Sequence, residues 1–192
     1  VWLGRELFFA KSLSLEGDVA CVSCHHPSLA GGDALSLPIG TAAVDPDLLG
    51  PGRVYDWRDR GKKDPHAAPG PNVARNSPTV FNVGLYERAL FHDGRVQKKR
   101  RGGFRSPESA RDSGRDMLGV QARLPVASEV EMRGFNALRY APPDRVRSRL
   151  IERLGNNSAW REAFARAFGD ETISYDRIET ALSDYQLTFV LD

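Results

Sequence analysis

The most distinctive chemistry in the sequence is a short segment, Cys21-Val22-Ser23-Cys24-His25, which has the pattern C-x-x-C-H. This pattern is typical of covalent attachment of a c-type haem. Residues three and four apart share one face of a helical turn, so both thiols can reach one porphyrin edge while the imidazole lies beneath the iron. The sequence therefore predicts Cys21 and Cys24 as haem attachment residues and His25 as the proximal iron ligand.

Other interpretations of the two thiols remain open from the residues alone. A C-x-x-C pair also occurs in thioredoxin-type redox sites, although no βαβ pattern surrounds this one. With His66 and His92 the thiols make a candidate Cys₂His₂ zinc site, and the motif can also arise by chance. The haem interpretation predicts a periplasmic protein, because the cysteines must stay available for thioether formation outside the cytosol.

Size and composition limit the class of protein. The chain has 192 residues, of which 41% are hydrophobic and 27% charged, as expected for one ordinary globular domain. No segment reaches the roughly 18 consecutive apolar residues that a membrane helix needs, so no span is predicted. The chain has no initiator Met and stops at Asp192 after an apolar run, which we interpret as a processed chain cut at a domain boundary.

Helical patterns lie at the two ends of the sequence. Apolar spacing predicts a helix over residues 2–9. Pro143 is suited to the first position of a later helix, and Ser158 and Ser174 are candidate N-caps of two more. Residues 27–75 are rich in Gly, Pro and Asp and lack periodicity, so long loops that need a large cofactor to fold around are predicted. Residues 79–91 predict a short apolar element.

The net charge of +2 is unevenly distributed. Residues 95–115 contain eight basic and two acidic side chains, a net +6, so the remainder of the chain carries −4. A basic run can indicate nucleic-acid binding. Here the run is broken by Gly, Ser and Pro and contains one aromatic residue, Phe104, so we predict an exposed loop and no nucleic-acid partner.

Several segments together resemble the bacterial di-haem cytochrome c peroxidase family, which includes the MauG-like enzymes. The resemblance extends from residue 3 to about residue 135. The matching segments, in order, are Leu3-Gly4-Arg5-Glu6-Leu7-Phe8-Phe9, Cys21 to Pro27, Arg75-Asn76-Ser77-Pro78-Thr79-Val80-Phe81-Asn82, Phe91-His92-Asp93-Gly94-Arg95, and the spaced residues Gln121, Pro125, Glu131 and Met132.

The resemblance implies an all-α, cytochrome c-like helical domain with long loops wrapped around covalent haem. It implies that residues 1–192 form the peroxidatic half of a two-haem enzyme. The second, electron-transfer haem domain would then lie beyond residue 192 or on a separate chain, because this chain contains a single C-x-x-C-H motif. Dimers and a calcium ion between the two halves are also implied.

Roles on the distal side of the haem follow from the same resemblance. Glu131 matches the catalytic acid–base residue, and Gln121 matches an amide that orients peroxide or water. Pro125 matches a proline that keeps the distal pocket narrow. A carboxylate close to an apolar haem face should have a raised pKa because of desolvation.

Three further positions have roles that the resemblance implies less completely. Asn76 matches a calcium ligand, and an oxygen donor suits that hard cation. His66 is the candidate distal haem ligand, although the loop that contains it differs in length from that of the family. His92 occupies the electron-relay position, where the family has a tryptophan.

The resemblance implies a periplasmic oxidoreductase that reduces hydrogen peroxide to water with electrons from a small cytochrome or cupredoxin. The alternative is MauG-like, peroxide-dependent oxidation of tryptophan side chains on a partner protein. A third reading is an electron carrier with an axial methionine, for which Met117 and Met132 are the only candidates. We prefer the enzyme, because Met132 directly follows Glu131 in the peroxidase motif.

Overall fold

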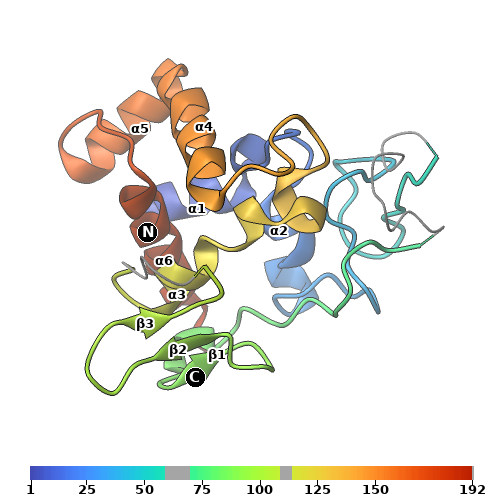
Figure 1. The fold of residues 1–192 in the computed structure, drawn as a ribbon, viewed down its shortest axis with the longest axis horizontal. Helices are drawn as coiled ribbons and strands as arrows, with labels where there is room; N and C mark the ends of the chain where they lie inside the picture. Colours follow the sequence, from blue (N-terminus) through green and yellow to red (C-terminus); the bar gives the residue numbers. More distant parts are fainter. Residues whose placement is uncertain (59–69, 109–113, 192) are drawn as a thin grey trace.

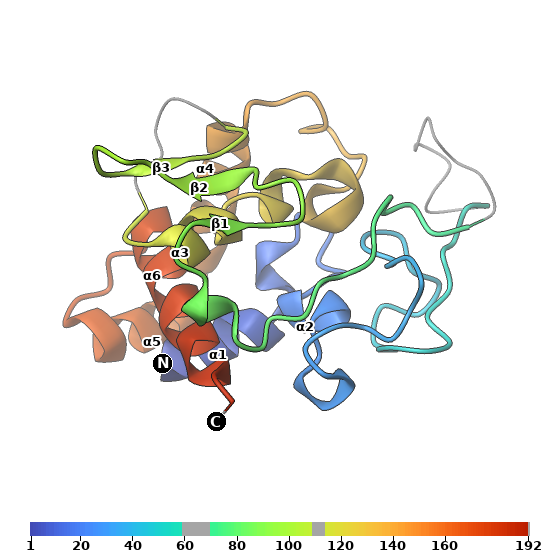
Figure 2. The same cartoon turned by 90° about the horizontal axis from the view of Figure 1, so that it is seen from below.

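The computed structural model describes residues 1–58, 70–108 and 114–191 (Figure 1). Helices form one side of the molecule, and loops of residues 27–58 and 70–82 form the other (Figures 1 and 2). The helices are α1 (Trp2–Phe9), α2 (Cys21–Cys24), α3 (Met117–Ala122), α4 (Pro143–Gly155), α5 (Ser158–Phe168) and α6 (Tyr175–Gln186). Shorter helical turns are η1 (Lys11–Leu13), η2 (Pro27–Leu29), η4 (Val83–Leu85), η5 (Pro125–Ala127), the π-helix η6 (Glu129–Arg133) and η7 (Leu187–Phe189).

Helix α6 is the centre of the helical side, where it packs against α1, α3 and α4. Its crossing with α1 is close, because Gly4 has no side chain at the contact. A Cβ atom on Gly4 would lie 1.8 Å from the carbonyl oxygen of Ala181. Aromatic rings pack at the crossing. The Phe8 ring lies edge-on to the Tyr185 ring, and their centroids are 5.4 Å apart. The main core lies around this crossing.

The helices predicted at the ends of the sequence are confirmed, with one shift. Pro143 is the first residue of α4, and the Ser174 side chain caps α6 by accepting from the Arg177 amide. Helix α5 begins at Ser158, but its N-cap is Asn157, whose side chain accepts from two amides of the first turn. No helix in the described part of the chain combines the length and apolar character needed to cross a bilayer.

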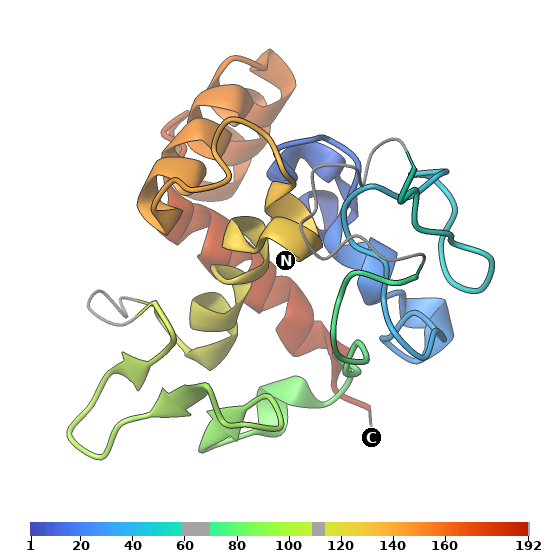
Figure 3. The same ribbon diagram turned by 45° about the vertical axis from the view of Figure 1, so that its right-hand side comes forward.

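A small antiparallel sheet corrects the all-α prediction and the prediction of a loop over the basic run. Its strands are β1 (Ala89–Leu90), β2 (Val96–Lys98) and β3 (Phe104–Arg105), in that order (Figure 3). Lys98 lies opposite Phe104. Buried Leu90 and Val96 pack on α3, which accounts for strands in a sequence of low strand propensity. Gly102 and Gly103, both at positive φ, form the β2–β3 turn.

The long loops are confirmed for the described residues, and a buried arginine holds them in place. The Arg53 guanidinium, only 3% exposed, donates to backbone carbonyls at 2.9–3.2 Å. Those carbonyls belong to Ile39, Gly40, Pro46 and Leu48. One side chain therefore supplies the donors that strands or helices would otherwise provide.

Substitution of Gly4 tests whether the α1–α6 crossing sets the stability of the helical side. We expect Gly4→Ala to lower the free energy of unfolding by about 1–3 kcal/mol, because the added methyl forces two backbones apart. Urea unfolding of the haem-loaded protein measures this. Gly155→Ala is the matched control: its Cβ would meet nothing within 4 Å at the end of α4, so it should be neutral or stabilising. Equal stability of the two variants would contradict the assignment.

Candidate haem site

Helix α2 places the C-x-x-C-H motif as one helical turn, as the sequence predicts. The Ser23 hydroxyl accepts a hydrogen bond from the Ala20 amide at 3.1 Å, and the His25 amide donates to the Cys21 carbonyl at 3.0 Å. Val22 and Ser23 are buried in the protein. Cys21, Cys24 and His25 keep partial exposure, so the three side chains remain accessible to a ligand.

The His25 ring is oriented by backbone carbonyls. Its Nδ1 lies 3.0 Å from the carbonyl oxygen of Pro78 and 3.2 Å from that of Gly31. Carbonyl oxygens only accept, so Nδ1 carries the proton and Nε2 keeps its lone pair for a metal. Burial lowers the pKa of His25, which favours the neutral imidazole that binds a metal. The Ser77 hydroxyl donates to the Cys24 carbonyl at 2.6 Å and ties the same two segments together.

The surroundings of the two thiols favour the neutral form. Both cysteines are free, and burial raises the pKa of each to about 12, with Asp33 and Glu131 carboxylates adding to the shift at Cys24. A reactive dithiol needs surroundings that stabilise thiolate, which is the opposite shift. Among the described residues no group of three His, Cys, Asp or Glu side chains is placed to hold a metal ion.

Glu131 lies in the π-helix η6, which a loop presses into position. The π pattern is visible in the bonds from the Arg133 amide to the Ser128 carbonyl and from Gly134 to Glu129, both 2.9 Å. A Cβ atom on Gly40 would lie 2.1 Å from the Val130 carbonyl oxygen, so only glycine allows this approach. The backbone around Gly40 and Thr41 therefore packs directly on the π-helix that carries Glu131, and the Thr41 amide donates to the Val130 carbonyl at 3.0 Å.

The electrostatics of Glu131 match a proton-transfer group. Burial raises its pKa, while the positive charge of Arg95 and a hydrogen bond from Ser128 oppose the shift. The negative charge of Glu131 also contributes to the raised pKa of the Cys24 thiol. Gln121, in α3, and Pro125, which begins η5, precede Glu131 on successive turns and are both half-buried.

The carboxylate of Asp93 connects Arg95, whose charge acts on Glu131, to Arg75, which begins the segment that holds His25. Asp93 accepts from Arg95 Nε at 3.1 Å and from Arg75 Nη1 at 3.3 Å. Arg95 in turn lies over the Phe91 ring, at 4.3 Å from its centroid. Phe91 has a φ of 65°, a costly conformation for a bulky residue. The FHDGR segment is thus held in a strained turn.

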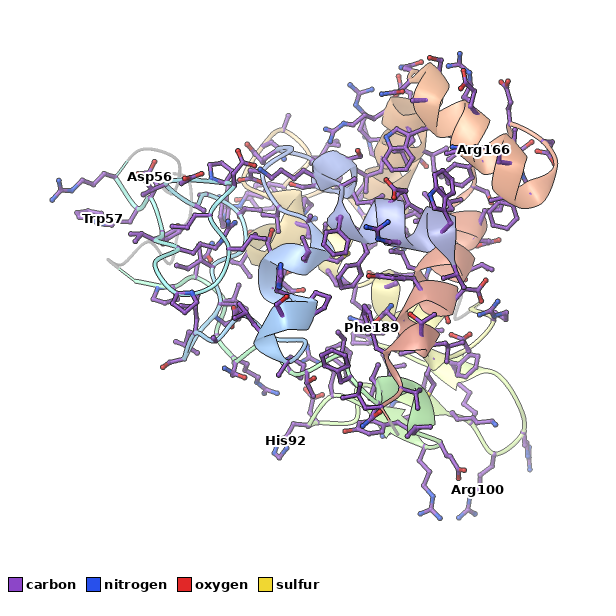
Figure 4. All side chains as sticks on the ribbon, turned by 180° about the vertical axis from the view of Figure 1, so that it is seen from behind. Asp56, Trp57, His92, Arg100, Arg166 and Phe189 are labelled. Carbon is purple, nitrogen blue, oxygen red and sulfur yellow. The ribbon has the colours of Figure 1, made fainter. Side chains whose placement is uncertain are left out.

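The remaining predicted residues have less central positions. Asn76 is exposed, and its Nδ2 donates to the Leu35 carbonyl at 2.7 Å, which secures the adjacent loop. His92 is exposed and points away from the body of the protein (Figure 4). His26 is half-buried, and its Nδ1 accepts from the Ser28 amide at 3.1 Å. His66 lies outside the described residues.

Sequence reasoning missed the groups that support the motif. Ser77 and Pro78 lie in a segment that the sequence singled out for Asn76 alone, so a signal was present. Asp33 is 2% exposed, and its Oδ2 has no hydrogen-bond partner among the described residues. Its position after a Gly-Gly pair was a weak signal, whereas nothing in the sequence marked the role of Arg53.

Comparison with known proteins gives a consistent result. The model of the family described as di-haem cytochrome c peroxidase matches residues 1–192. The chain is 29% identical over 188 residues to methylamine utilization protein MauG of Methylophilus methylotrophus. It is 28% identical over 188 residues to cytochrome c551 peroxidase of Nitrosomonas europaea. In both cases the alignment covers 98% of this chain and 39% of the relative.

Solved structures show the same fold. A MauG-like protein associated with microbial copper homeostasis aligns with a TM-score of 0.59 and 22% identity, over 99% of this chain and 40% of the other. The di-haem peroxidase BthA of Burkholderia thailandensis aligns with a TM-score of 0.56 and 21% identity, over 98% and 37%. The chain spans about two-fifths of these relatives, and over that length it belongs to the di-haem cytochrome c peroxidase family.

Proposed function

We propose that the chain is the peroxidatic haem domain of a periplasmic enzyme that reduces hydrogen peroxide to water. Electrons would come from a small cytochrome or cupredoxin through a second haem domain. The observation that carries the proposal is the half-buried carboxylate of Glu131 on the π-helix, whose pKa is raised by desolvation and whose charge acts on the Cys24 thiol. An electron carrier has no use for such a group, whereas peroxide cleavage needs one.

The residues of the C-x-x-C-H turn would bind the cofactor for this reaction. Cys21 and Cys24 would hold a haem c, and His25 would offer Nε2 to its iron, because Nδ1 donates to the Pro78 carbonyl. When bound, the haem supplies an iron centre that exchanges electrons with peroxide. The electron-rich imidazole, hydrogen-bonded at Nδ1, strengthens donation to the metal.

Proton transfer is the task of Glu131. Reduction of one peroxide consumes two electrons and two protons and forms two waters. The ionised carboxylate would accept the proton of one peroxide oxygen and return it to the other oxygen, which would leave as water. The oxygen left behind would take up the two electrons and the two protons and become the second water. Gln121 would orient the peroxide through its amide, and Pro125 would keep the pocket narrow.

A MauG-like oxidation of tryptophan on a partner protein is the second candidate. The observation in its favour is His92, an exposed imidazole at the position where the resemblance leads one to expect a relay tryptophan. Methylamine utilization protein MauG is also among the relatives. The electron-carrier reading is weaker, because Met132 and Met117 are buried in two hydrophobic clusters, only 3% and 8% exposed.

Other expectations stay proposals of the same kind. Calcium binding would use the Asn76 side-chain oxygen, with His66 as a candidate distal ligand of the iron. A homodimer is the proposed assembly. Neither a nucleic-acid partner nor a membrane span forms part of the proposal.

Removal of the thiols tests the attachment. We expect Cys21→Ser/Cys24→Ser to lose haem on a denaturing gel, because no thioether remains to hold it. Haem staining of the gel is the measurement. His26→Ala is the control and should keep the stain, since the His26 ring accepts a hydrogen bond from the nearby Ser28 amide and lacks a thiol. A double serine variant that still stains would contradict covalent attachment here.

Neutralising Glu131 tests the proton transfer. We expect Glu131→Gln to lower kcat for peroxide by about 10²–10⁴-fold, as for other lost acid–base groups. Since burial raises the pKa of Glu131, the wild-type rate should fall as the pH drops through that pKa and the carboxylate becomes protonated. The variant should lack this acid limb.

The control for that substitution lies in the same π-helix. Glu129 pairs with Arg133 at 3.1 Å and Arg139 at 3.3 Å, so Glu129→Gln should weaken structure but keep kcat within about twofold. A Glu131→Gln enzyme with the wild-type pH profile would remove Glu131 from the mechanism.

Visible spectra separate the two candidate functions. The full-length, haem-loaded protein receives one equivalent of peroxide without a donor. If it responds only after reduction of one haem, and then consumes peroxide with a reduced cytochrome, the peroxidase proposal stands. A lasting spectral change that disappears only when a tryptophan-bearing partner protein is added would favour side-chain oxidation. A protein without a haem band would refute both.

A further inference from the structure

The segment that contains Gln121 and Pro125 is tied to helix α6 by a buried ion pair. Arg123, the C-cap of α3, lies between these two residues in the sequence. Its Nη1 donates to Oε2 of Glu179 at 2.7 Å and to Oδ1 of Asp176 at 3.4 Å. Glu179 is 2% exposed, and both acids belong to α6, which packs beside α3 (Figure 2). The ion pair therefore joins this segment to the central helix.

Backbone carbonyls at the end of α3 are held as well. The Tyr175 hydroxyl donates to the Ala122 carbonyl at 3.2 Å. Arg147 Nη1 donates to the Arg123 carbonyl, also at 3.2 Å. Carbonyls in the last turn of a helix lack amide partners within that helix, so these bonds supply them. The guanidinium groups of Arg123 and Arg147 lie 5.4 and 5.5 Å from the centroid of the Tyr175 ring.

Arg147 connects this arrangement to other parts of the molecule. It is 5% exposed, and it pairs with Asp144 of α4 at 2.9 Å and with Glu108, which follows β3, at 2.7 Å. Glu179 in turn lies against α3, because a Cβ atom on Gly119 would be 3.8 Å from the Glu179 Cβ and Cδ atoms. The ion pair is thus part of a packed contact between α3, α4 and α6.

A buried ion pair of this kind specifies position more than it adds stability. Desolvation raises the pKa of Glu179, and the hydrogen bond and charge of Arg123 oppose that shift. Replacing both partners by apolar residues of similar volume is often neutral, because the desolvation cost of the two charges disappears. The pair instead contributes a charge-assisted hydrogen bond with a narrow range of length and direction.

The Gln121 side chain depends on this support. Within the described parts of the chain no hydrogen bond holds that side chain, so its place follows from the backbone of α3. That backbone reaches Arg123 two residues later, and Pro125 begins η5 two residues after that. A shift at Arg123 would therefore move both neighbours.

We propose that Arg123 is a positioning residue of the peroxide site, whose ion pair with Glu179 sets where the Gln121 amide and the Pro125 ring lie. This inference rests on the proposed function, in which Gln121 orients peroxide. It adds to that function a residue outside the spaced motif that carries the family resemblance. Arg123 acts through its neighbours and takes no part in proton transfer, which stays with Glu131.

Replacing both partners of the ion pair tests the inference in the full-length, haem-loaded enzyme. Arg123→Met alone would leave a buried carboxylate unpaired and destabilise the protein, so it is combined with Glu179→Leu. We expect this double variant to unfold at a urea concentration close to that of the wild type. Its kcat/KM for peroxide should fall by about tenfold, because a misplaced amide orients peroxide poorly. The acid limb of the pH profile should remain, since Glu131 is unchanged.

Combination with Gln121→Ala shows whether Arg123 acts through Gln121. Gln121→Ala alone should lower kcat/KM by a similar factor, and adding it to the double variant should cause little further loss. If the two losses multiply in the combined variant, the inference is wrong. It is equally wrong if the double variant keeps the wild-type kcat/KM.

A matched control lies at the start of the same helix. Arg177 and Asp170 also pair at 2.7 Å. Arg177→Met/Asp170→Asn removes an ion pair and leaves the net charge unchanged, as the double variant does. This control should keep kcat/KM within about twofold of the wild type. An equal loss in the control would assign Arg123 a general structural role and overturn the inference.

Anion binding without turnover keeps the inference separate from the proposed function. Cyanide binding to the haem iron is followed in the visible spectrum after reduction of one haem. It should weaken by about 2–10-fold in both Gln121→Ala and the double variant, because the amide no longer donates to the bound anion. If the wild type reduces no peroxide, the proposed function fails, and weaker cyanide binding in both variants still supports Arg123 as a positioning residue. Unchanged cyanide affinity in the double variant would refute the inference.

Discussion

This structure depends on one constraint: backbone carbonyl groups that lie outside strands and helices must still find hydrogen-bond donors. Long loops leave many backbone oxygens buried without an amide donor, and each would cost free energy if left unpaired. Arginines meet this need at several places. Arg53 binds the carbonyls of the 38–50 loop, Arg153 those of Ser14 and Leu15, and Arg133 that of Ala141. The high arginine content therefore has a structural use besides surface charge.

The same loops position both the His25 ring and the π-helix of Glu131 in the candidate site. The His25 ring depends on carbonyls at Gly31 and Pro78, and the π-helix of Glu131 depends on the close approach of Gly40. Asp93 connects the Arg75 segment to Arg95 between these sides. Helices α1 and α6 provide a rigid base, and the loops set the detailed positions. Substitutions in loops should therefore alter chemistry more than stability.

Features with local causes could be predicted from the sequence. The C-x-x-C-H turn, α1, α4 and α6 follow from spacing and capping, and only the N-cap of α5 moved, from Ser158 to Asn157. The sheet could not be foreseen, because its strands are two or three residues long and are stabilised by packing on α3. The partners of His25 were hidden for another reason: a backbone carbonyl acceptor has no residue signature.

Glu131 illustrates both what the sequence could predict and what it could not. Its place in the motif predicted the residue and a raised pKa, and burial does raise that pKa. The π-helix that carries it follows no helical period visible in the sequence, and the backbone of Gly40 packs closely against it. The raised pKa of Glu131 could thus be predicted, because it depends on residue type. The π-helical backbone that carries Glu131 could not, because it involves contacts with residues that are distant in the sequence.

The hydrogen bond from His25 to Pro78 also sets an order of events during maturation. Thioether formation needs only a local peptide with two thiols and a histidine. The ring tautomer, in contrast, is fixed by two carbonyls, that of Gly31 and that of Pro78, which arrives from 53 residues further along the chain. Until Pro78 is in place, the imidazole under a newly attached cofactor would be oriented by the Gly31 carbonyl alone. In a haem-bearing chain, the colour of the iron would report the completion of folding, and a stained gel band the completion of attachment.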